Sequence, residues 1–358
     1  MTETRSAVVT ETEVLERLWG AVIDGDEYAA VGTVFAALDE GMNPERALLE
    51  LIAPVQHRIG TEWAANRLTV AQEHAATAIN ERVIAALAHH PGCRRTADAG
   101  RVTVACVDGE WHALPARLLA EVLRLRGWQV DFLGAQVPTP HLIAHLHQHG
   151  PDAVALSCSI PTRLPTAHAA ITACQAAGLY VLAGGAAFGR DGRYARLLGA
   201  DAWAPDAQSA AECLSGDFPR VRFSSNHQPI DDLPHLADQE FTMVSRSAAQ
   251  LVETTVGELE HRYPAMAGYT DAQRQHTVED IAHIVDFLAT ALYTDDDELF
   301  TEFVVWTAGI LDARGVPTGS LYPALELLAA QLRDFPRTQR ILSAARTALT
   351  DTHNKHHV

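Results

Sequence analysis

A histidine in the short stretch GEWHALP, residues 109–115, is placed where it could do chemistry. His112 follows RVTVACV, an apolar run typical of a buried strand, and it precedes PARLLAEVLRLRG, whose periodicity predicts a helix. Glu110 stands two residues before it. Taken alone, His112 could be an ordinary polar loop residue. An imidazole beside a carboxylate at the carboxyl end of a strand nevertheless lies where α/β folds bind their ligands.

Small and polar residues follow other expected strands in the same way. Ser157 and Ser159 lie in LSCSIPTRL, and Gly184, Gly185 and Gly189 lie in LAGGAAFG. Glycines at such positions allow a ligand to approach the backbone closely. We therefore expect these loops to share one binding site with His112.

Three types of segment must position these residues. Residues 12–92 carry apolar residues at helical spacing and predict a helical bundle. In residues 100–216 short apolar strands alternate with helices, which predicts a doubly wound, Rossmann-like parallel sheet. Residues 217–238 have the composition of a linker, and residues 239–350 return to a helical period. The expected fold class is α/β plus all-α.

Composition narrows the function classes. The formal net charge of −18 argues against direct binding of nucleic acid, which depends on neutralising phosphates. The five scattered cysteines favour reduced thiols. No run approaches the roughly 20 apolar residues of a membrane span, and no signal peptide is visible. We expect a cytoplasmic protein without a membrane partner.

The three loops together resemble the cobalamin-binding domains of the methionine synthase type. The resemblance implies that His112 is the lower ligand of cobalt and that Glu110, or Asp108, orients its other nitrogen. It also implies that Ser157, Gly184 and Gly185 line a groove for the nucleotide tail. The remaining residues of these motifs that we assign to the cofactor are Trp111, Ser159 and Thr162. Pro115 departs from the family pattern, where glycine is found, and puts the loop geometry in question.

The bundle carries a second motif. In WAANRLTVAQEH, Trp63 is followed after nine residues by Glu73 and His74. This spacing resembles the light-sensing adenosylcobalamin proteins of the CarH type, and it implies that the three side chains surround the adenosyl group on the upper face. A core tryptophan with a solvated Glu–His pair is the alternative. Ala64 stands where that family often has a second cobalt-ligating histidine, so the upper ligand after illumination stays open.

The order of the segments resembles the photocobilins, in which a cobalamin module precedes a globin-like helical domain that binds biliverdin. This resemblance implies a non-covalent bilin, because no cysteine follows Cys213. Candidate partners for the bilin are Arg274, His276, His283, Arg314 and Tyr322. Haem bound by one of the histidines and a simple all-α dimerisation domain are the alternatives.

These resemblances predict a photoreceptor, not an enzyme. Its cofactors would be adenosylcobalamin and biliverdin, and it would signal through conformational or oligomeric change. The chain as printed starts almost directly with the bundle, so we expect the output to pass through a homo-oligomer or a downstream signalling protein instead of direct operator binding. A corrinoid carrier in methyl transfer is the alternative function, and a cofactor-free scaffold is a third.

Overall fold

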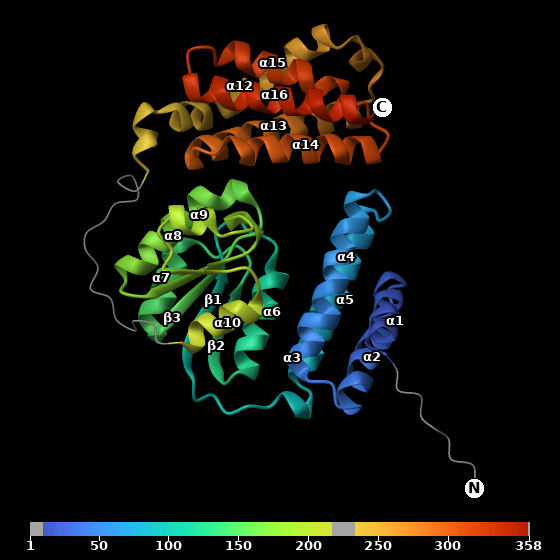
Figure 1. The fold of residues 1–358 in the computed structure, drawn as a ribbon, viewed down its shortest axis with the longest axis vertical. Coiled ribbons are helices and arrows are strands. Elements are labelled where there is room, and N and C mark those ends of the chain that lie inside the picture. Colours follow the sequence, from blue (N-terminus) through green and yellow to red (C-terminus); the bar gives the residue numbers. More distant parts are fainter. Residues whose placement is uncertain (1–9, 217–232, 357–358) are drawn as a thin grey trace.

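The computed structural model describes residues 10–216 and 233–356. Most of the expected linker, residues 217–238, falls outside the described residues. Figure 1 shows three parts: a helical bundle, a sheet covered by helices, and a second group of helices that lies across the upper ends of both.

Four long helices of amphipathic sequence build the N-terminal bundle. They are α1 (Glu11–Ile23), α2 (Glu27–Asp39), α4 (Ala53–Ala64) and α5 (Val70–Ala88). Thr10 and Thr69 begin α1 and α5 with capping boxes, in which each threonine hydroxyl accepts a hydrogen bond from the backbone N–H of the third helical residue, Glu13 or Gln72. The short α3 (Pro44–Arg46) leads into α4.

A wider helical turn joins α3 to α4. Residues Ala47–Ile52 form a π-helix, and the backbone N–H of Ala53 bonds to the carbonyl of Leu48, five residues back. Pro54 follows at once and has no N–H to continue the α-helical ladder. The π-helix therefore ends next to the proline, and residues 44–64 form a continuous helix that is not uniformly α-helical.

The sheet domain has the parallel, doubly wound fold. Its strands are β1 (Gly100–Cys106), β2 (Trp128–Gly134), β3 (Ala153–Ser157), β4 (Tyr180–Gly184) and β5 (Ala202–Ala204). Its helices are α6 (Ala113–Leu125), α7 (Thr139–His149), α8 (Leu164–Ala176), α9 (Arg193–Leu197) and α10 (Ala207–Ser215). The strand order is β2-β1-β3-β4-β5, with every pair parallel.

The C-terminal part is helical. Its long helices are α12 (Glu240–Arg262), α13 (Asp271–Thr294), α14 (Asp297–Ala313), α15 (Leu321–Gln331) and α16 (Pro336–His356). Asp295, in the left-handed conformation, ends α13, and the side chain of Asp296 caps α14, so the two helices run antiparallel. Along residues 10–216 and 233–356, none of the helices combines the length and apolarity needed to cross a bilayer.

Two hydrophobic cores lie on opposite faces of the sheet. One contains bundle residues, such as Leu48 and Ile84, together with Leu123 of α6. The other joins Ile171 of α8 to Leu288 of α13 and so extends into the C-terminal part. The predicted combination of a helical bundle, a Rossmann-like parallel sheet and a C-terminal helical region is confirmed.

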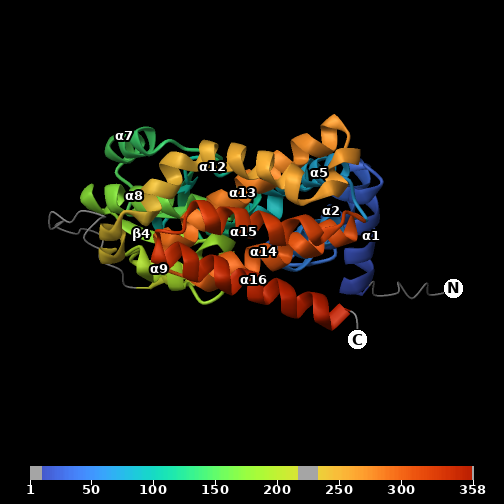
Figure 2. The same ribbon diagram turned by 90° about the horizontal axis from the view of Figure 1, so that it is seen from above.

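Polar contacts fix the C-terminal part to the sheet domain. His168 of α8 is fully buried, and its Nδ1 lies 2.8 Å from the hydroxyl of Tyr293 at the end of α13. The Tyr194 hydroxyl donates a hydrogen bond of 2.8 Å to Asp296. Seen from above, α13 and α14 extend over both the sheet domain and the bundle (Figure 2).

Candidate functional site

The loops that follow β1 and β3 meet at the point where the strand order reverses. Because β1 lies between β2 and β3, the connection after β1 turns one way across the sheet and the connection after β3 turns the other way. Cys106 at the end of β1 is paired in register with Ser157 at the end of β3. This switch point is where open α/β sheets bind ligands.

A single buried carboxylate connects the two loops. Glu110 is 1% exposed, and its Oε1 accepts hydrogen bonds from the backbone N–H of His112 at 2.8 Å and from Nδ1 of His112 at 2.6 Å. Its Oε2 accepts from the backbone N–H groups of Ser159 at 2.6 Å and Ile160 at 3.1 Å. The sequence left Glu110 and Asp108 open as partners of the histidine, and the structure selects Glu110, since Asp108 is exposed.

These hydrogen bonds keep Glu110 ionised. Burial acts to raise the pKa of this carboxyl, but the side-chain and backbone hydrogen bonds from His112, with those from Ser159 and Ile160, outweigh it and lower the pKa to about 2. The hydrogen bond that His112 donates to Glu110 raises the pKa of His112, and burial of the ring acts in the opposite direction. A permanent anion therefore faces Nδ1 of the imidazole.

The other ring nitrogen of His112 is available for a ligand. The side chain is 55% exposed, and among the described residues Nε2 has no hydrogen-bond partner. A histidine whose Nδ1 is held by a carboxylate while Nε2 is open has the arrangement of a metal ligand. Pro115 does not distort this loop. Because α6 begins at Ala113, the proline occupies the first turn, where its missing N–H costs no hydrogen bond.

The glycines after β4 have different structural roles. Gly185 has φ +105°, and a Cβ there would lie 2.2 Å from the carbonyl oxygen of Cys158. Only glycine fits this close approach of two backbone segments. Gly184, paired in register with the buried Ser157, would meet no atom closer than 3.5 Å. The two glycines and Ser157 thus lie together at the carboxyl ends of β3 and β4.

The remaining motif residues occupy the same rim. Trp111 is 70% exposed beside His112, and Thr162 lies in the short 3-10 turn η3 (Pro161–Arg163) after β3. Arg163 was not singled out in the sequence. Its guanidinium covers Gly109, where an added Cβ would lie 3.1 Å away. The positive φ of Gly109, +76°, explains why glycine is needed there, but no local sequence signal identifies its neighbour.

The bundle presents its motif to the same region. Trp63 lies at the end of α4 and is partly buried, while Glu73 and His74 lie in the first turns of α5. Glu73 accepts a hydrogen bond from Thr77 at 2.9 Å and contacts Nδ1 of His74 at 2.6 Å. Glu73 also interacts electrostatically with His112. Of the three motif residues, Glu73 is thus the one that the structure relates to His112.

A residue of the C-terminal part reaches this site. The guanidinium carbon of Arg314 lies 5.1 Å from the centroid of the Trp63 ring, a cation–π contact. Arg314 was expected to bind a bilin carboxylate, and the structure instead places it on the bundle.

The other expected bilin residues do not gather around one cavity. His276 and His283 are exposed on α13. Tyr322 is 41% exposed, and its hydroxyl accepts a hydrogen bond of 3.1 Å from Arg346. Arg274 pairs with Glu260 of α12. The positions of these four side chains depend on packing between helices that are far apart in the sequence, which the local sequence pattern does not predict.

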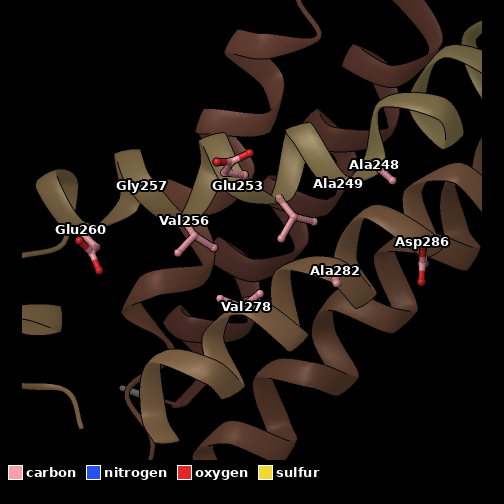
Figure 3. Close-up of a pocket in the computed structure, with 10 residues that line it drawn as sticks. Ala248, Ala249, Glu253, Val256, Gly257, Glu260, Val278, Ala282 and Asp286 are labelled. Carbon is pink, nitrogen blue, oxygen red and sulfur yellow. The ribbon is translucent and has the colours of Figure 1, made fainter. Parts of the chain in front are cut away.

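A groove lies between α12 and α13 in the C-terminal part (Figure 3). Its volume is about 640 Å³, and its apolar walls include Val252 and Val256 of α12 and Val278 of α13. Glu253, Glu260 and Asp286 add carboxylates at its rim. None of the histidines or tyrosines proposed for a bilin lines it.

Two stretches of the chain match families of known proteins. Residues 14–88 and residues 100–214 each match a family described as B12 binding domain. The first stretch is the bundle, and the second is the sheet domain with its His112 loop. Fold, site and family matches define the class: this is a cobalamin-binding protein.

Curated relatives match over parts of the chain. The HTH-type transcriptional repressor CarA of Myxococcus xanthus is 33% identical over 151 residues, 40% of this chain and 46% of CarA. The repressor CarH of the same organism is 34% identical over 125 residues, 34% of this chain and 40% of CarH. The chain thus spans less than half the length of either repressor.

Corrinoid proteins are similar over the first two parts of the chain. Dimethylamine corrinoid protein 1 of Methanosarcina acetivorans is 25% identical over 207 residues, 56% of this chain and 96% of that protein. The structure of the Methanosarcina barkeri monomethylamine corrinoid protein has a TM-score of 0.50 at 19% identity, and the match covers 57% of this chain and 98% of that one. At this identity the likeness shows the fold alone.

Proposed function

We propose that this protein is a light sensor that binds adenosylcobalamin and signals without a substrate. The observation that carries the proposal is the pair formed by Glu110 and His112 at the switch point. The Trp63, Glu73 and His74 motif of the bundle supports it, since Glu73 interacts electrostatically with His112. The similarity to CarH over 34% of the chain supports it, because CarH-type proteins share the bundle motif that the sequence resembles.

The residues present fit the cofactor. Nε2 of His112 would hold cobalt from below, and the rim formed by Ser157, Gly184 and Gly185 would receive the nucleotide tail, since Gly185 admits no side chain. When bound, adenosylcobalamin supplies a weak cobalt–carbon bond that visible light can break. The anionic Glu110 holds the imidazole in one orientation and leaves Nε2 free to bind metal.

Residues of the bundle would act on the upper side. Trp63 would pack on the adenosyl group and exclude water, while Glu73 orients His74 through their contact at 2.6 Å. Ala64 has no ligating atom, so the exposed His74 is the residue of this motif that could bind the upper position after illumination. The output would be a change in oligomeric state or in contact with a downstream protein.

The test is the absorbance spectrum of the protein reconstituted with adenosylcobalamin, recorded in the dark and after green light. We expect rapid, irreversible loss of the alkylcobalamin band at neutral pH without any substrate, together with a shift in elution volume on size exclusion. A spectrum that is stable to light, or protein that stays colourless with cobalamin, contradicts the proposal.

A corrinoid carrier in methyl transfer is the second candidate. The similarity to dimethylamine corrinoid protein 1 over 96% of its length favours it. A carrier would bind methylcobalamin, resist green light at the same dose and exchange the methyl group when a methyl donor and its partner methyltransferase are added. The light sensor would lose its alkylcobalamin band under that light and would not exchange a methyl group with a donor.

We also propose that the α12–α13 groove binds biliverdin without a covalent bond. A volume of about 640 Å³ with apolar walls suits a flat tetrapyrrole. Asp286 would accept hydrogen bonds from pyrrole N–H groups, and Arg274, beside Glu260 at the rim, would face a propionate. Titration with biliverdin should give a red-shifted, induced band that Asp286→Ala weakens and the exposed-face variant Glu258→Ala does not. An identical band in both variants would place the bilin elsewhere.

A further inference from the structure

The helix α14 connects the two domains that would enclose the cofactor. Near its start it contacts the sheet domain: the Tyr194 hydroxyl donates 2.8 Å to Asp296, which caps α14, and Arg193 pairs with Glu298 at 2.6 Å. Figure 1 shows α14 extending from above the sheet domain to above the end of α4. One element of the C-terminal part therefore touches both the sheet domain and the bundle.

The far end of α14 contacts the bundle at its functional motif. Arg314 follows the last helical residue, and its guanidinium lies over the ring of Trp63 at 5.1 Å. The side chain of Asn66 donates a hydrogen bond of 3.4 Å to the carbonyl of Ala313, one residue before Arg314. Two adjacent residues at the end of α14, Ala313 and Arg314, thus meet Asn66 and Trp63 at the end of α4.

Several features hold Arg314 in this place. Its guanidinium donates to the carbonyl of Ile310 at 3.3 Å, and it interacts electrostatically with Asp280 of α13. Because a cation–π contact uses one face of an aromatic ring, the guanidinium covers one face of Trp63 and leaves the other face or the edge for a ligand. The contact therefore restricts the position and orientation of the Trp63 ring.

We infer that Arg314 is a positioning residue that sets the selectivity of the upper cobalamin face by holding Trp63, and that the C-terminal part senses the upper ligand through it. The inference rests on the proposed function, in which Trp63 packs on the adenosyl group. Specifically, Arg314 lies outside both cobalamin-binding domains and makes the protein bind adenosylcobalamin more tightly than a cobalamin with a small upper ligand.

The test compares dissociation constants for adenosylcobalamin and methylcobalamin, measured in the dark on the full chain. Arg314→Ala should weaken adenosylcobalamin binding by about fivefold, a typical cation–π contribution, and change methylcobalamin binding by less than about twofold. Arg314→Lys should keep most of the selectivity, because an ammonium can also bind a ring face. Arg333→Ala, in which the lost side chain is 81% exposed, is the matched control and should behave as the wild type.

A double-mutant cycle separates positioning from general damage. In a Trp63→Ala background, Arg314→Ala should have no further effect on the ratio of the two constants. Hydrogen exchange of residues 57–68 in cobalamin-free protein gives a second readout, and it should become faster in Arg314→Ala than in Arg333→Ala.

The outcomes separate this inference from the proposed function. If the wild type binds neither cobalamin, the proposed function fails and the inference fails with it. If the wild type binds adenosylcobalamin but Arg314→Ala leaves the ratio unchanged, or weakens both cobalamins equally, the inference alone is overturned. A ratio that still changes in the Trp63→Ala background overturns it as well, because Arg314 would then act by another route.

Discussion

Nδ1 of His112 lies 2.6 Å from Oε1 of Glu110, and the same oxygen accepts the backbone N–H of His112 at 2.8 Å. A side chain held twice by one buried carboxylate has little freedom to rotate, so the direction of Nε2 is fixed before any ligand arrives. Preorganisation of this kind lowers the cost of binding. The two loops that Glu110 connects follow different strands, β1 and β3. The same carboxylate therefore holds these loops together and orients the imidazole of His112.

The first prediction concerns the metal ligand. His112→Ala removes Nε2, the atom expected to bind cobalt, and should weaken binding of hydroxocobalamin by about tenfold or more, with a spectrum that lacks imidazole ligation. Absorbance titration measures both. His141→Ala, which removes an exposed histidine on α7, is the control and should leave binding and spectrum unchanged. An unaltered spectrum in His112→Ala would show that another group holds the metal.

The second prediction is a pH dependence of stability. The pKa of Glu110 is lowered from 4.5 to about 2, so its ionised form stabilises the fold above pH 4.5, and this contribution is lost as the pH falls from 4.5 through 2. A shift of this size corresponds to about 3 kcal/mol. Denaturant unfolding of the cobalamin-free protein should show this loss. In Glu110→Gln the dependence over the same range should be smaller by about that amount. Equal slopes in the two proteins would contradict the network around Glu110.

The sequence predicts the sheet and its loops well because each signal there is local. The alternation of strands and helices follows from hydrophobic period, and His112, Ser157 and Gly184 are recognisable at strand ends. The choice between Glu110 and Asp108 is different. Both flank the same turn, and only the packed structure shows which carboxylate is buried against the backbone of Ser159.

The third prediction uses two neighbouring glycines. Gly185→Ala would place a Cβ 2.2 Å from a backbone oxygen at a positive φ, so it should destabilise the protein by about 1–3 kcal/mol or more. Gly184→Ala meets nothing closer than 3.5 Å and should change the free energy of unfolding by less than about 1 kcal/mol. Thermal and denaturant unfolding check the difference. Similar losses in both variants would mean that the two loops do not approach as closely as described.

The C-terminal part was much harder to predict in its contacts than in its helices. The helical period of residues 239–350 predicts helices there, and α14 (Asp297–Ala313) is one of them, because an apolar period is a local signal. Its contact with Trp63 joins residues that are about 250 positions apart, and nothing near Arg314 in the sequence signals a ring to bind. Polar residues on one face of a helix indicate that this face is not part of a hydrophobic core, but they do not predict which domain packs against it.

The fourth prediction tests how the C-terminal part is attached. Tyr293→Phe keeps the ring that packs against Phe241 and removes the hydroxyl that lies 2.8 Å from Nδ1 of the buried His168. Loss of this hydrogen bond between α13 and α8 should lower the free energy of unfolding by about 1–2 kcal/mol. Tyr28→Phe, at a tyrosine that is 87% exposed, should cost almost nothing. Cobalamin affinity should stay within about twofold of the wild type in both variants, because neither hydroxyl belongs to the site. If Tyr293→Phe is as stable as Tyr28→Phe, the C-terminal part is not held on the sheet domain through this contact.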